Sequence, residues 1–272
     1  MKIFSWNNIL EFLNTGIQSN FFNCNTGISI GCFDGVHKGH QVLLNTLISR
    51  CREDNLKSGV VTFRRPLPSI KQSGNYNGDI SSLDCRLSIL ESLGLDFVIV
   101  VDFDDEFASQ LGADFLNILV NACNMELLAE GVDFRCGYKG ATDIQAIKYF
   151  GEKNNVKTVF VEPVYYREGT DEEERISSSF IREMVTRGFF ETVAEMLGRP
   201  YEIDVSDIIK KSNGQGKFSI MKKDFVQVLP SNGVYRGYDE NGGEVRVVVS
   251  DNDIKFEMID KKRSELRRIL FK

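Results

Sequence analysis

Both histidines of this 272-residue sequence lie in one short segment, at His37 and His40. The segment is G-C-F-D-G-V-H-K-G-H-Q, in which Phe33-Asp34-Gly35 predicts a tight turn and the apolar positions after His40 follow a helical period. The first turn of a helix has N–H groups without partners and the positive end of the helix dipole, so it can hold a phosphate. Two imidazoles on one helix face could bond its oxygens, and Gly39 would let it approach the backbone. The alternative is a strand–helix junction whose histidines only cap and fill.

A second polar segment, R-I-S-S-S-F-I-R, runs from Arg175 to Arg182. Three serines before a helical stretch predict an N-cap, and their hydroxyl groups suit phosphate binding. Arg182 would follow one turn later as a fixed cation. The alternative is an ordinary helix cap and a solvated arginine.

Two further loops are candidates for ligand contacts. Gly131 to Gly140 contains three glycines, which predicts a loop whose backbone comes close to a ligand or a plain surface turn. Thr62 to Pro68 contains two prolines, which end the preceding strand and form a rigid turn.

These segments all follow predicted strands, which alternate with helices over the first two thirds of the chain. This order predicts a doubly wound α/β fold with a parallel sheet, in which ligands bind beyond the carboxyl ends of the strands. The expected strands are 2–4, 28–32, 59–63, 97–101, 126–129 and 158–161. The expected helices are 7–13, 43–48, 82–93, 113–123, 142–154 and 189–197.

Short alternating segments dominate from Lys217 onward and predict a small antiparallel β-barrel-like domain. Its expected strands are 218–221, 225–229, 233–238, 244–250 and 254–259, with a hairpin turn at Asn241-Gly242-Gly243. A basic helical tail is expected from Arg263 to Arg268. We place the domain boundary between residues 186 and 187, which gives domains 1–186 and 187–272.

The composition favours a cytoplasmic globular protein. A hydrophobic content of 42% and a charged content of 26% are ordinary, and a net charge of −6 argues against a nucleic-acid partner. We find no apolar run of about 18 residues and no signal pattern in residues 1–13, so no membrane partner is expected. The six cysteines form no C-x-x-C pair and are expected to be reduced, mainly buried. The oligomeric state is left open.

The histidine segment resembles the H-x-G-H element of the nucleotidylyltransferase superfamily. More narrowly, it is similar to G-x-F-D-G-V-H-x-G-H-Q of the bacterial FAD synthetases, the bifunctional riboflavin kinase/FMN adenylyltransferases. The serine segment resembles that family's R-x-S-S-T-x-I-R, and the glycine loop its G-x-D-F-R-F-G. Leu197 to Tyr201 matches L-G-R-P-Y. The resemblance covers about residues 25 to 201.

The resemblance implies an FMN adenylyltransferase that converts ATP and FMN to FAD and pyrophosphate with Mg2+, as a step of riboflavin metabolism. The catalytic residues that it implies are His37, His40, Arg175, Ser178 and Arg182. The ATP contacts that it implies are Gly31, Cys32, Phe33, Asp34, Gly35, Gly39, Asp133, Ser177 and Ser179. The flavin contacts that it implies are Phe63, Pro66 and Pro68. On this basis, we expect His40→Ala and Arg182→Ala to reduce turnover severely and to leave the fold intact.

The sequence departs from the family at several positions. Cys136 replaces an aromatic residue, Leu67 replaces a histidine, and Ser179 replaces a threonine. The kinase motif P-T-A-N is missing between Tyr201 and Leu229, so we expect a degenerate riboflavin kinase module without kinase activity. The alternatives are nucleotidyl transfer to another phosphorylated acceptor and a non-catalytic flavin- or nucleotide-binding regulatory protein.

Overall fold

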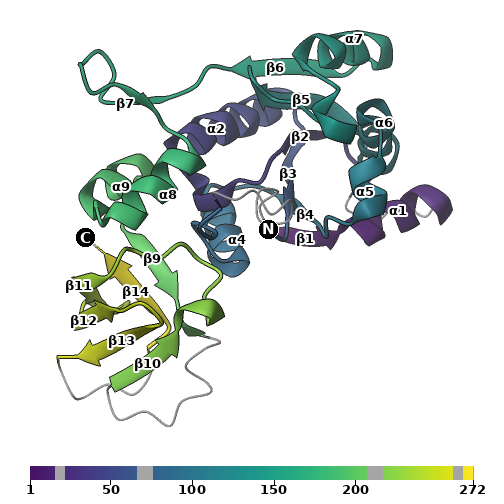
Figure 1. Cartoon of the computed structure of the whole chain (residues 1–272). Coiled ribbons are helices and arrows are strands. Elements are labelled where there is room, and N and C mark those ends of the chain that lie inside the picture. The colour runs from purple at the N-terminus through teal and green to yellow at the C-terminus, as the bar shows by residue number, and fades with distance from the viewer. Residues whose placement is uncertain (16–21, 66–75, 207–216, 260–265, 272) are drawn as a thin grey trace. The chain divides into compact units, whose positions relative to one another are not determined.

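The computed structural model describes residues 1–15, 22–65, 76–206, 217–259 and 266–271. It divides into two compact units (Figure 1). The parallel-sheet unit comprises residues 1–33, 39–71 and 87–164, and the second unit comprises residues 34–38, 72–86 and 165–272. The residues from 34 to 38 and the helix 178–187 therefore group with the C-terminal part. The predicted boundary at residue 186 stays a prediction.

The parallel-sheet unit is built on a six-stranded parallel sheet in the order β1-β4-β3-β2-β5-β6. Its strands are β1 (Lys2–Ser5), β2 (Thr26–Ile30), β3 (Lys57–Phe63), β4 (Phe97–Val101), β5 (Met125–Gly131) and β6 (Lys157–Val161). Every residue of β2 and β4 is buried. Central parallel strands are covered on both faces, which is why their sequences are continuous apolar runs.

The helices lie on both faces of this sheet (Figure 1). They are α1 (Trp6–Thr15), α2 (Lys38–Glu53), α4 (Leu83–Ser92), α5 (Asp105–Ser109), α6 (Gly112–Cys123) and α7 (Ile144–Asn154), with a 3-10 turn η3 (Tyr138–Gly140). Helices α1, α6 and α7 pack on the face that carries Ile28 and Phe97. Helix α2 covers the other face, where a Cβ on Gly27 would lie 2.3 Å from Cys51 Sγ. The predicted doubly wound fold is confirmed.

The second unit contains a six-stranded antiparallel sheet in the order β10-β13-β12-β11-β14-β9. Its strands are β9 (Tyr201–Asp204), β10 (Lys217–Met221), β11 (Gly233–Tyr238), β12 (Glu244–Val249), β13 (Asp253–Met258) and β14 (Arg268–Phe271). Two helices, a short hairpin and two 3-10 turns accompany it: α8 (Ser178–Arg187), α9 (Phe190–Leu197), β7 (Tyr165–Tyr166), β8 (Glu174–Arg175), η2 (Asp34–Val36) and η4 (Lys222–Asp224). The predicted antiparallel β domain is confirmed.

Helix α9 is attached to this sheet by aromatic side chains. The rings of Phe190 and Phe271 stack with centroids 4.3 Å apart, and Phe190 also stacks on Tyr201. The Tyr201 hydroxyl donates a 2.6 Å hydrogen bond to the carbonyl of Val228. This contact explains why the L-G-R-P-Y segment sits at the junction of helix and sheet.

Two predictions for this unit are wrong. The expected helical tail is contradicted at Arg268, because residues 268–271 form β14 and pair with β9 and β11; residues 263–265 lie outside the described part. The expected strand 225–229 is not formed. There the Gln227 side chain accepts from Asp204 N–H and donates to the carbonyls of Ile80 and Glu202, at 2.7–3.1 Å.

Candidate active site

The predicted turn after β2 is strained. Phe33 and Val36 have φ angles of 46° and 40°, and Gly35 has a φ of 75°. A β-branched residue such as valine rarely adopts a positive φ, and such strain collects at functional sites. Glycine is required at position 35, because a Cβ there would lie 2.7 Å from Cγ2 of Ile80. The surrounding contacts therefore hold the backbone between β2 and α2 in an energetically unfavourable conformation.

Asp34 anchors this turn from within the second unit. Its carboxylate is 1% exposed and accepts hydrogen bonds from the N–H groups of Ile80 and Ser81, at 3.0 and 3.1 Å. It also forms a salt bridge with Nη2 of Arg182. Its partners are all protein groups, which gives Asp34 a positioning role. The implied contact of Asp34 with ATP stays a prediction.

Arg182 is held on two sides. Besides the salt bridge to Asp34, its Nε donates a 2.8 Å hydrogen bond to the carbonyl of Gly78. Its guanidinium carbon lies 4.9 Å from the ring centre of Tyr76. Its remaining nitrogen, Nη1, has no hydrogen-bond partner among the described residues. A fixed cation with one nitrogen available can bind an anion at little cost in side-chain entropy.

The serine segment caps α8 as predicted. The Ser177 hydroxyl accepts a hydrogen bond from the N–H of Phe180 at 3.2 Å. The Ser178 hydroxyl donates to the carbonyl of Asp34 at 3.2 Å, so this cap also supports the strained turn. Ser179 is exposed. The Ser178 contact is one that the sequence did not indicate.

His37 is 6% exposed. Burial, followed by the positive charges of Arg175, Arg199 and Arg182, lowers its pKa to about 3. The imidazole is therefore neutral at physiological pH, and it lies in a positive potential. Neutral His37 can still donate one N–H to a phosphate oxygen. The arrangement is suited to an anion.

Arg199 is a member of this cluster that sequence reasoning missed. Its Nη2 donates a 2.6 Å hydrogen bond to the carbonyl of Gly35, and its Nη1 donates to the carbonyl of Leu197. Burial lowers the pKa of this guanidinium from its usual value. The sequence showed Arg199 only as part of a junction motif, and nothing in its spacing indicated that it holds the histidine turn.

His40 occupies the third position of α2, after Lys38 and Gly39. The helix begins at Lys38, so His37 precedes it and the two histidines do not share a helix face, contrary to the expectation. The His40 ring makes an edge contact with the ring of Phe33, with centroids 5.3 Å apart. This placement puts His40 in the helix turn that has free backbone N–H groups.

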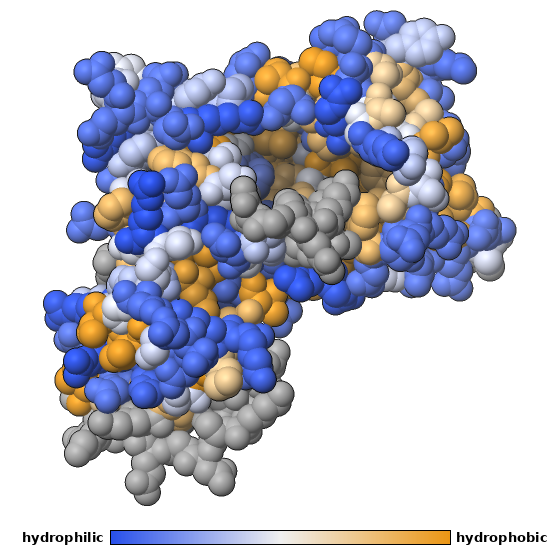
Figure 2. All heavy atoms as spheres, in the orientation of Figure 1, coloured by the Kyte–Doolittle hydropathy of each residue, from blue (hydrophilic) through white to orange (hydrophobic). Residues whose placement is uncertain are grey.

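The parallel-sheet unit contains an aromatic cavity of about 430 Å³. It lies at the carboxyl ends of β2, β3 and β5, where the strand order reverses, and ligands bind at that point in doubly wound sheets. Five phenylalanines line it: Phe63, Phe103, Phe107, Phe115 and Phe134. Figure 2 shows hydrophobic residues around a hollow of this unit beside α5 and α6. An apolar, aromatic cavity of this size suits a heteroaromatic ring.

Several of the predicted ligand contacts line this cavity, namely Gly31, Cys32 and Phe63. Pro66 and Pro68 lie outside the described residues. The glycine loop supplies a wall through residues 134–140. Gly137 is required for packing, because a Cβ at its φ of 73° would lie 2.3 Å from the backbone nitrogen of Gly112. Asp133 is not among the residues that line the cavity.

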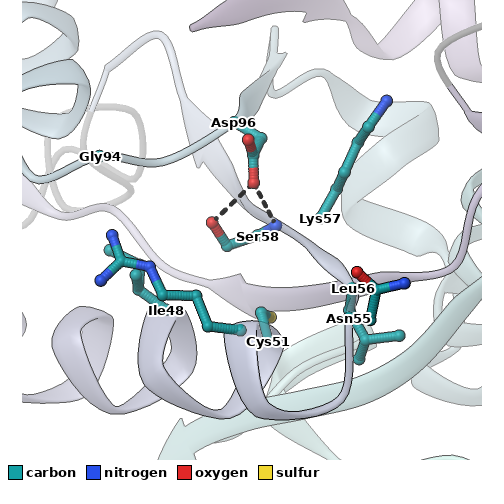
Figure 3. A pocket seen from close by; sticks show the side chains of 9 residues that line it. Ile48, Cys51, Asn55, Leu56, Lys57, Ser58, Gly94 and Asp96 are labelled. Carbon is teal, nitrogen blue, oxygen red and sulfur yellow. Dashed lines mark hydrogen bonds between the residues drawn. The ribbon is translucent and has the colours of Figure 1, made fainter.

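A second cavity, of about 360 Å³, lies at the amino ends of β3 and β4 (Figure 3). The Asp96 carboxylate accepts hydrogen bonds there from the N–H and hydroxyl of Ser58, at 2.8 and 3.1 Å. These groups satisfy each other, and the cavity is at the end of the sheet away from the strained turn. We assign it no chemistry.

Among the described residues, no group of three or more His, Cys, Asp or Glu side chains is arranged to hold a metal ion. No helix in the same residues has the length and hydropathy needed to cross a membrane. None of the six cysteines, all of which are described, forms a disulfide bond.

Comparison with known proteins connects these features with a family. Residues 20–180 match the family described as FAD synthetase. The chain is 29% identical over 182 residues to the bifunctional riboflavin kinase/FMN adenylyltransferase of Buchnera aphidicola (Schizaphis graminum), covering 66% of this chain and 57% of that protein. It is 27% identical over 209 residues to the FAD synthetase of Listeria monocytogenes, covering 77% and 79%. The chain thus spans little more than half of the first of these relatives.

The crystal structure of a macrolide-efflux protein from Streptococcus pneumoniae has the same fold over the whole chain. The TM-score is 0.76 at 19% identity, and the match covers 100% of this chain and 90% of that one. At this identity the likeness shows the fold alone. The family match covers more than half of the residues and includes the histidine, glycine and serine segments. The chain belongs to the FAD synthetase family, within the nucleotidylyltransferase superfamily.

Proposed function

We propose that this protein is an FMN adenylyltransferase, which joins FMN and ATP to give FAD and pyrophosphate. The observation that carries the proposal is the cluster of Arg175, Arg182 and Arg199 around neutral His37, next to the serine cap of α8. Such a cluster favours a polyphosphate over an uncharged ligand. Family membership supplies the reaction.

In this reaction an oxygen of the FMN phosphate attacks the α-phosphorus of ATP. A new P–O bond forms on the side opposite the bond to the β-phosphate, and that bond breaks to release pyrophosphate. No general base is needed, because the attacking phosphate is already ionised. The protein contributes positioning and charge stabilisation.

We assign His37 and His40 to the α- and β-phosphates. Arg175, Arg182 and the Ser177–Ser179 turn hold the leaving pyrophosphate. His40 belongs to the parallel-sheet unit and Arg182 to the second unit, so their action on one triphosphate is part of the proposal. Neutral His37 donates an N–H to a phosphate oxygen without needing to lose or gain a proton.

The aromatic cavity receives one of the two heterocycles, adenine or the isoalloxazine ring of FMN. Gly31 and Cys32 provide a narrow wall, and Phe63 provides an aromatic face for stacking. The rim carries Gln110, Arg135 and Lys139, which can contact ribose, ribityl or phosphate groups. The flavin contacts of Pro66 and Pro68 stay predictions.

Mg2+ fits this site as a companion of ATP. The described residues hold no cluster that would cage the ion, and Mg2+ in nucleotide sites is bound mainly by phosphate oxygens and water. The ion would neutralise part of the triphosphate charge. The arginines and the N-terminus of the helix would then have to neutralise a smaller negative charge on the triphosphate.

We further propose that the second unit does not phosphorylate riboflavin, since the P-T-A-N segment is missing. This unit has a structural role in supporting the strained turn, through Arg199 and the segment 78–81. The proposal includes a cytoplasmic location, which is supported by six cysteines that form no disulfide bond.

The test uses the full chain with FMN, ATP and Mg2+, and follows FAD and pyrophosphate together. We expect equal amounts of both products, and we expect His40→Ala to lower kcat by about 10²- to 10³-fold. Asn45→Ala, an exposed position of the same helix, is the control and should leave turnover unchanged. Riboflavin with ATP should give no FMN. Absence of FAD, with both substrates bound, would refute the proposed function.

A further inference from the structure

Glu130 is a buried carboxyl group that the proposed mechanism does not use. It lies in β5 and is 1% exposed. Its Oε1 accepts a hydrogen bond from the N–H of Ile30 in β2, at 2.6 Å. The ladder between these strands ends at the pair Ile28–Leu128, whereas β5 continues beside β6 to Gly131. Glu130 therefore fills the place where the two central strands separate.

In the described part of the chain, no Lys or Arg side chain pairs with this carboxyl group. Burial raises the pKa of Glu130 well above its usual value, and the hydrogen bond from Ile30 opposes that rise only in part. Among the described residues, the Cys136 thiol has a pKa that is affected by Glu130. Burial, followed by the charge of Glu130, raises the pKa of Cys136 to about 12. Burial therefore favours the protonated, neutral form of both side chains.

A neutral carboxylic acid has a proton to donate. One oxygen of Glu130 is occupied as the acceptor for Ile30, and the other has no hydrogen-bond partner among the described residues. Leaving a buried donor without a partner is costly, so such groups usually mark a missing ligand or water. Glu130 is not itself among the residues that line the aromatic cavity, but Ile30, which donates to it, is. Cys136, whose pKa is raised by burial and then by the charge of Glu130, also lines the cavity.

We propose that Glu130 is a specificity-determining residue, whose protonated carboxyl group donates a hydrogen bond to a ring nitrogen or carbonyl oxygen of the heterocycle in the aromatic cavity. This rests on the proposed function, in which that cavity takes a ring of a substrate. Adenine and isoalloxazine both carry such acceptors. The five phenylalanines offer apolar ring surface alone, and a hydrogen-bond donor next to Ile30 would add selection for a ring that can accept a hydrogen bond.

A purely structural role is the competing explanation, in which Glu130 only caps the N–H of Ile30. Two substitutions separate the two roles. Glu130→Gln keeps an acceptor for Ile30 and an N–H donor for the ligand, so it imitates the neutral acid at every pH. Glu130→Met removes both functions at similar length. Glu126→Gln is the matched control, because Glu126 lies on the same strand and is exposed.

Calorimetry on the full chain measures the binding of adenosine and of riboflavin as separate probes. For one of these probes, we expect wild type, Glu130→Gln and Glu126→Gln to agree within about twofold at neutral pH. Glu130→Met should bind that probe about tenfold more weakly, the value of one lost hydrogen bond to a buried donor. In FAD synthesis, Glu130→Met should raise the KM of only the substrate that carries that ring.

Infrared difference spectra give a signal that should not change on ligand binding if Glu130 has only a structural role. The C=O stretch of a carboxylic acid, present in wild type and absent from Glu130→Gln, should shift when the probe binds. At alkaline pH the wild type should lose affinity and Glu130→Gln should not. The other charged or titratable groups that line the cavity, Arg135, Tyr138, Lys139 and Cys136, are the same in both proteins.

The inference is overturned if Glu130→Met binds both probes like wild type, if the carboxylic C=O stretch does not respond, or if neither probe binds the wild type. Its failure can be told apart from failure of the proposed function. Wild-type protein that makes no FAD but binds a ring in a Glu130-dependent way would refute the reaction and keep the inference. Normal FAD synthesis by Glu130→Met, with unchanged KM values, would refute the inference about Glu130 and keep the proposed reaction.

Discussion

The salt bridge between Asp34 and Arg182 is the contact whose removal should tell most about the second unit. The two side chains are 1% and 8% exposed, and 148 positions separate them in the sequence. Removing one member of a buried pair costs about 3–5 kcal/mol, because the other charge stays buried. Arg182→Met leaves Asp34 with its backbone donors, so we expect a loss near the lower limit, about 3 kcal/mol.

Asp34→Ala should cost more, about 5 kcal/mol. It leaves the charge of Arg182 uncompensated and also removes the acceptor of two buried N–H groups, those of Ile80 and Ser81. The double variant buries no isolated charge. Its loss should therefore be smaller than the sum of the single losses by about 2–3 kcal/mol.

Urea unfolding of the four proteins measures these values, and hydrogen exchange at Ile80 and Ser81 reports the local loss directly. Arg187→Met is the control, because this arginine is on the same helix and its pair with Glu183 is exposed on both sides. We expect that control to change stability by less than about 0.5 kcal/mol. Additive losses in the double variant, within about 0.5 kcal/mol, would refute the idea that the two charges depend on each other. The expectation that Arg182→Ala leaves the fold intact stays a prediction, and the same reasoning adds that this variant should be less stable.

Three further predictions concern single groups. Because burial raises the pKa of Glu130, its ionisation opposes folding. The wild type should therefore lose stability relative to Glu130→Gln as the pH rises above the ordinary glutamate pKa of 4.5, and a constant difference in melting temperature would contradict this. Because the pKa of His37 is about 3, its NMR signals should not titrate between pH 5 and 9. The contribution of neutral His37 to stability should be lost as the pH falls from about 6.5 towards 3. An NMR titration midpoint near 6.5 would contradict the burial of His37 among arginines. Gly137→Ala should destabilise far more than Gly169→Ala, as thermal melts would show, since both have positive φ but nothing lies within 4 Å of a Cβ at Gly169; equal losses would show that backbone strain alone decides.

The parallel-sheet unit could be predicted well from the sequence, because its strands are continuous apolar runs. Phe97–Val101 was predicted with the bounds that the structure has, and β3 differs only at its start. Loops after such strands meet at one edge of the sheet, so Gly31, Cys32 and Phe63 could be expected around one cavity. A local sequence pattern is sufficient to predict an element when distant residues contribute only burial to that element.

The predictions failed where distant partners decide the structure. The basic segment around Arg268 resembled a helix, but β14 gains its hydrogen bonds from β9, more than sixty positions earlier. At Gln227 a side-chain amide satisfies the backbone groups that an additional strand would have satisfied. Glu130 was counted as part of an ordinary strand, since periodicity gives no sign that its carboxyl group replaces a ladder bond.

The candidate site shows the same limit. The residue types in the histidine and serine segments indicated phosphate chemistry, but not that Asp34 would bind Arg182 or that Arg199 would hold Gly35. These contacts restrain a turn whose φ angles at Phe33 and Val36 are unfavourable. A sequence pattern can indicate which side chains suit an anion, whereas the strain and the contacts that oppose it exist only in three dimensions.

If the second unit binds the triphosphate as proposed, we expect this binding to be coupled to its folding. The strained turn is held by Asp34, Ser178 and Arg199, which belong to or adjoin the residues proposed to contact the triphosphate. A substitution at any of them changes the backbone that positions His37 and also the stability of the unit. The aromatic cavity is different, because its lining side chains come from several strand ends and α5 and α6. Substitutions at its rim should change ring affinity with little effect on folding, so the two halves of substrate recognition can be altered independently.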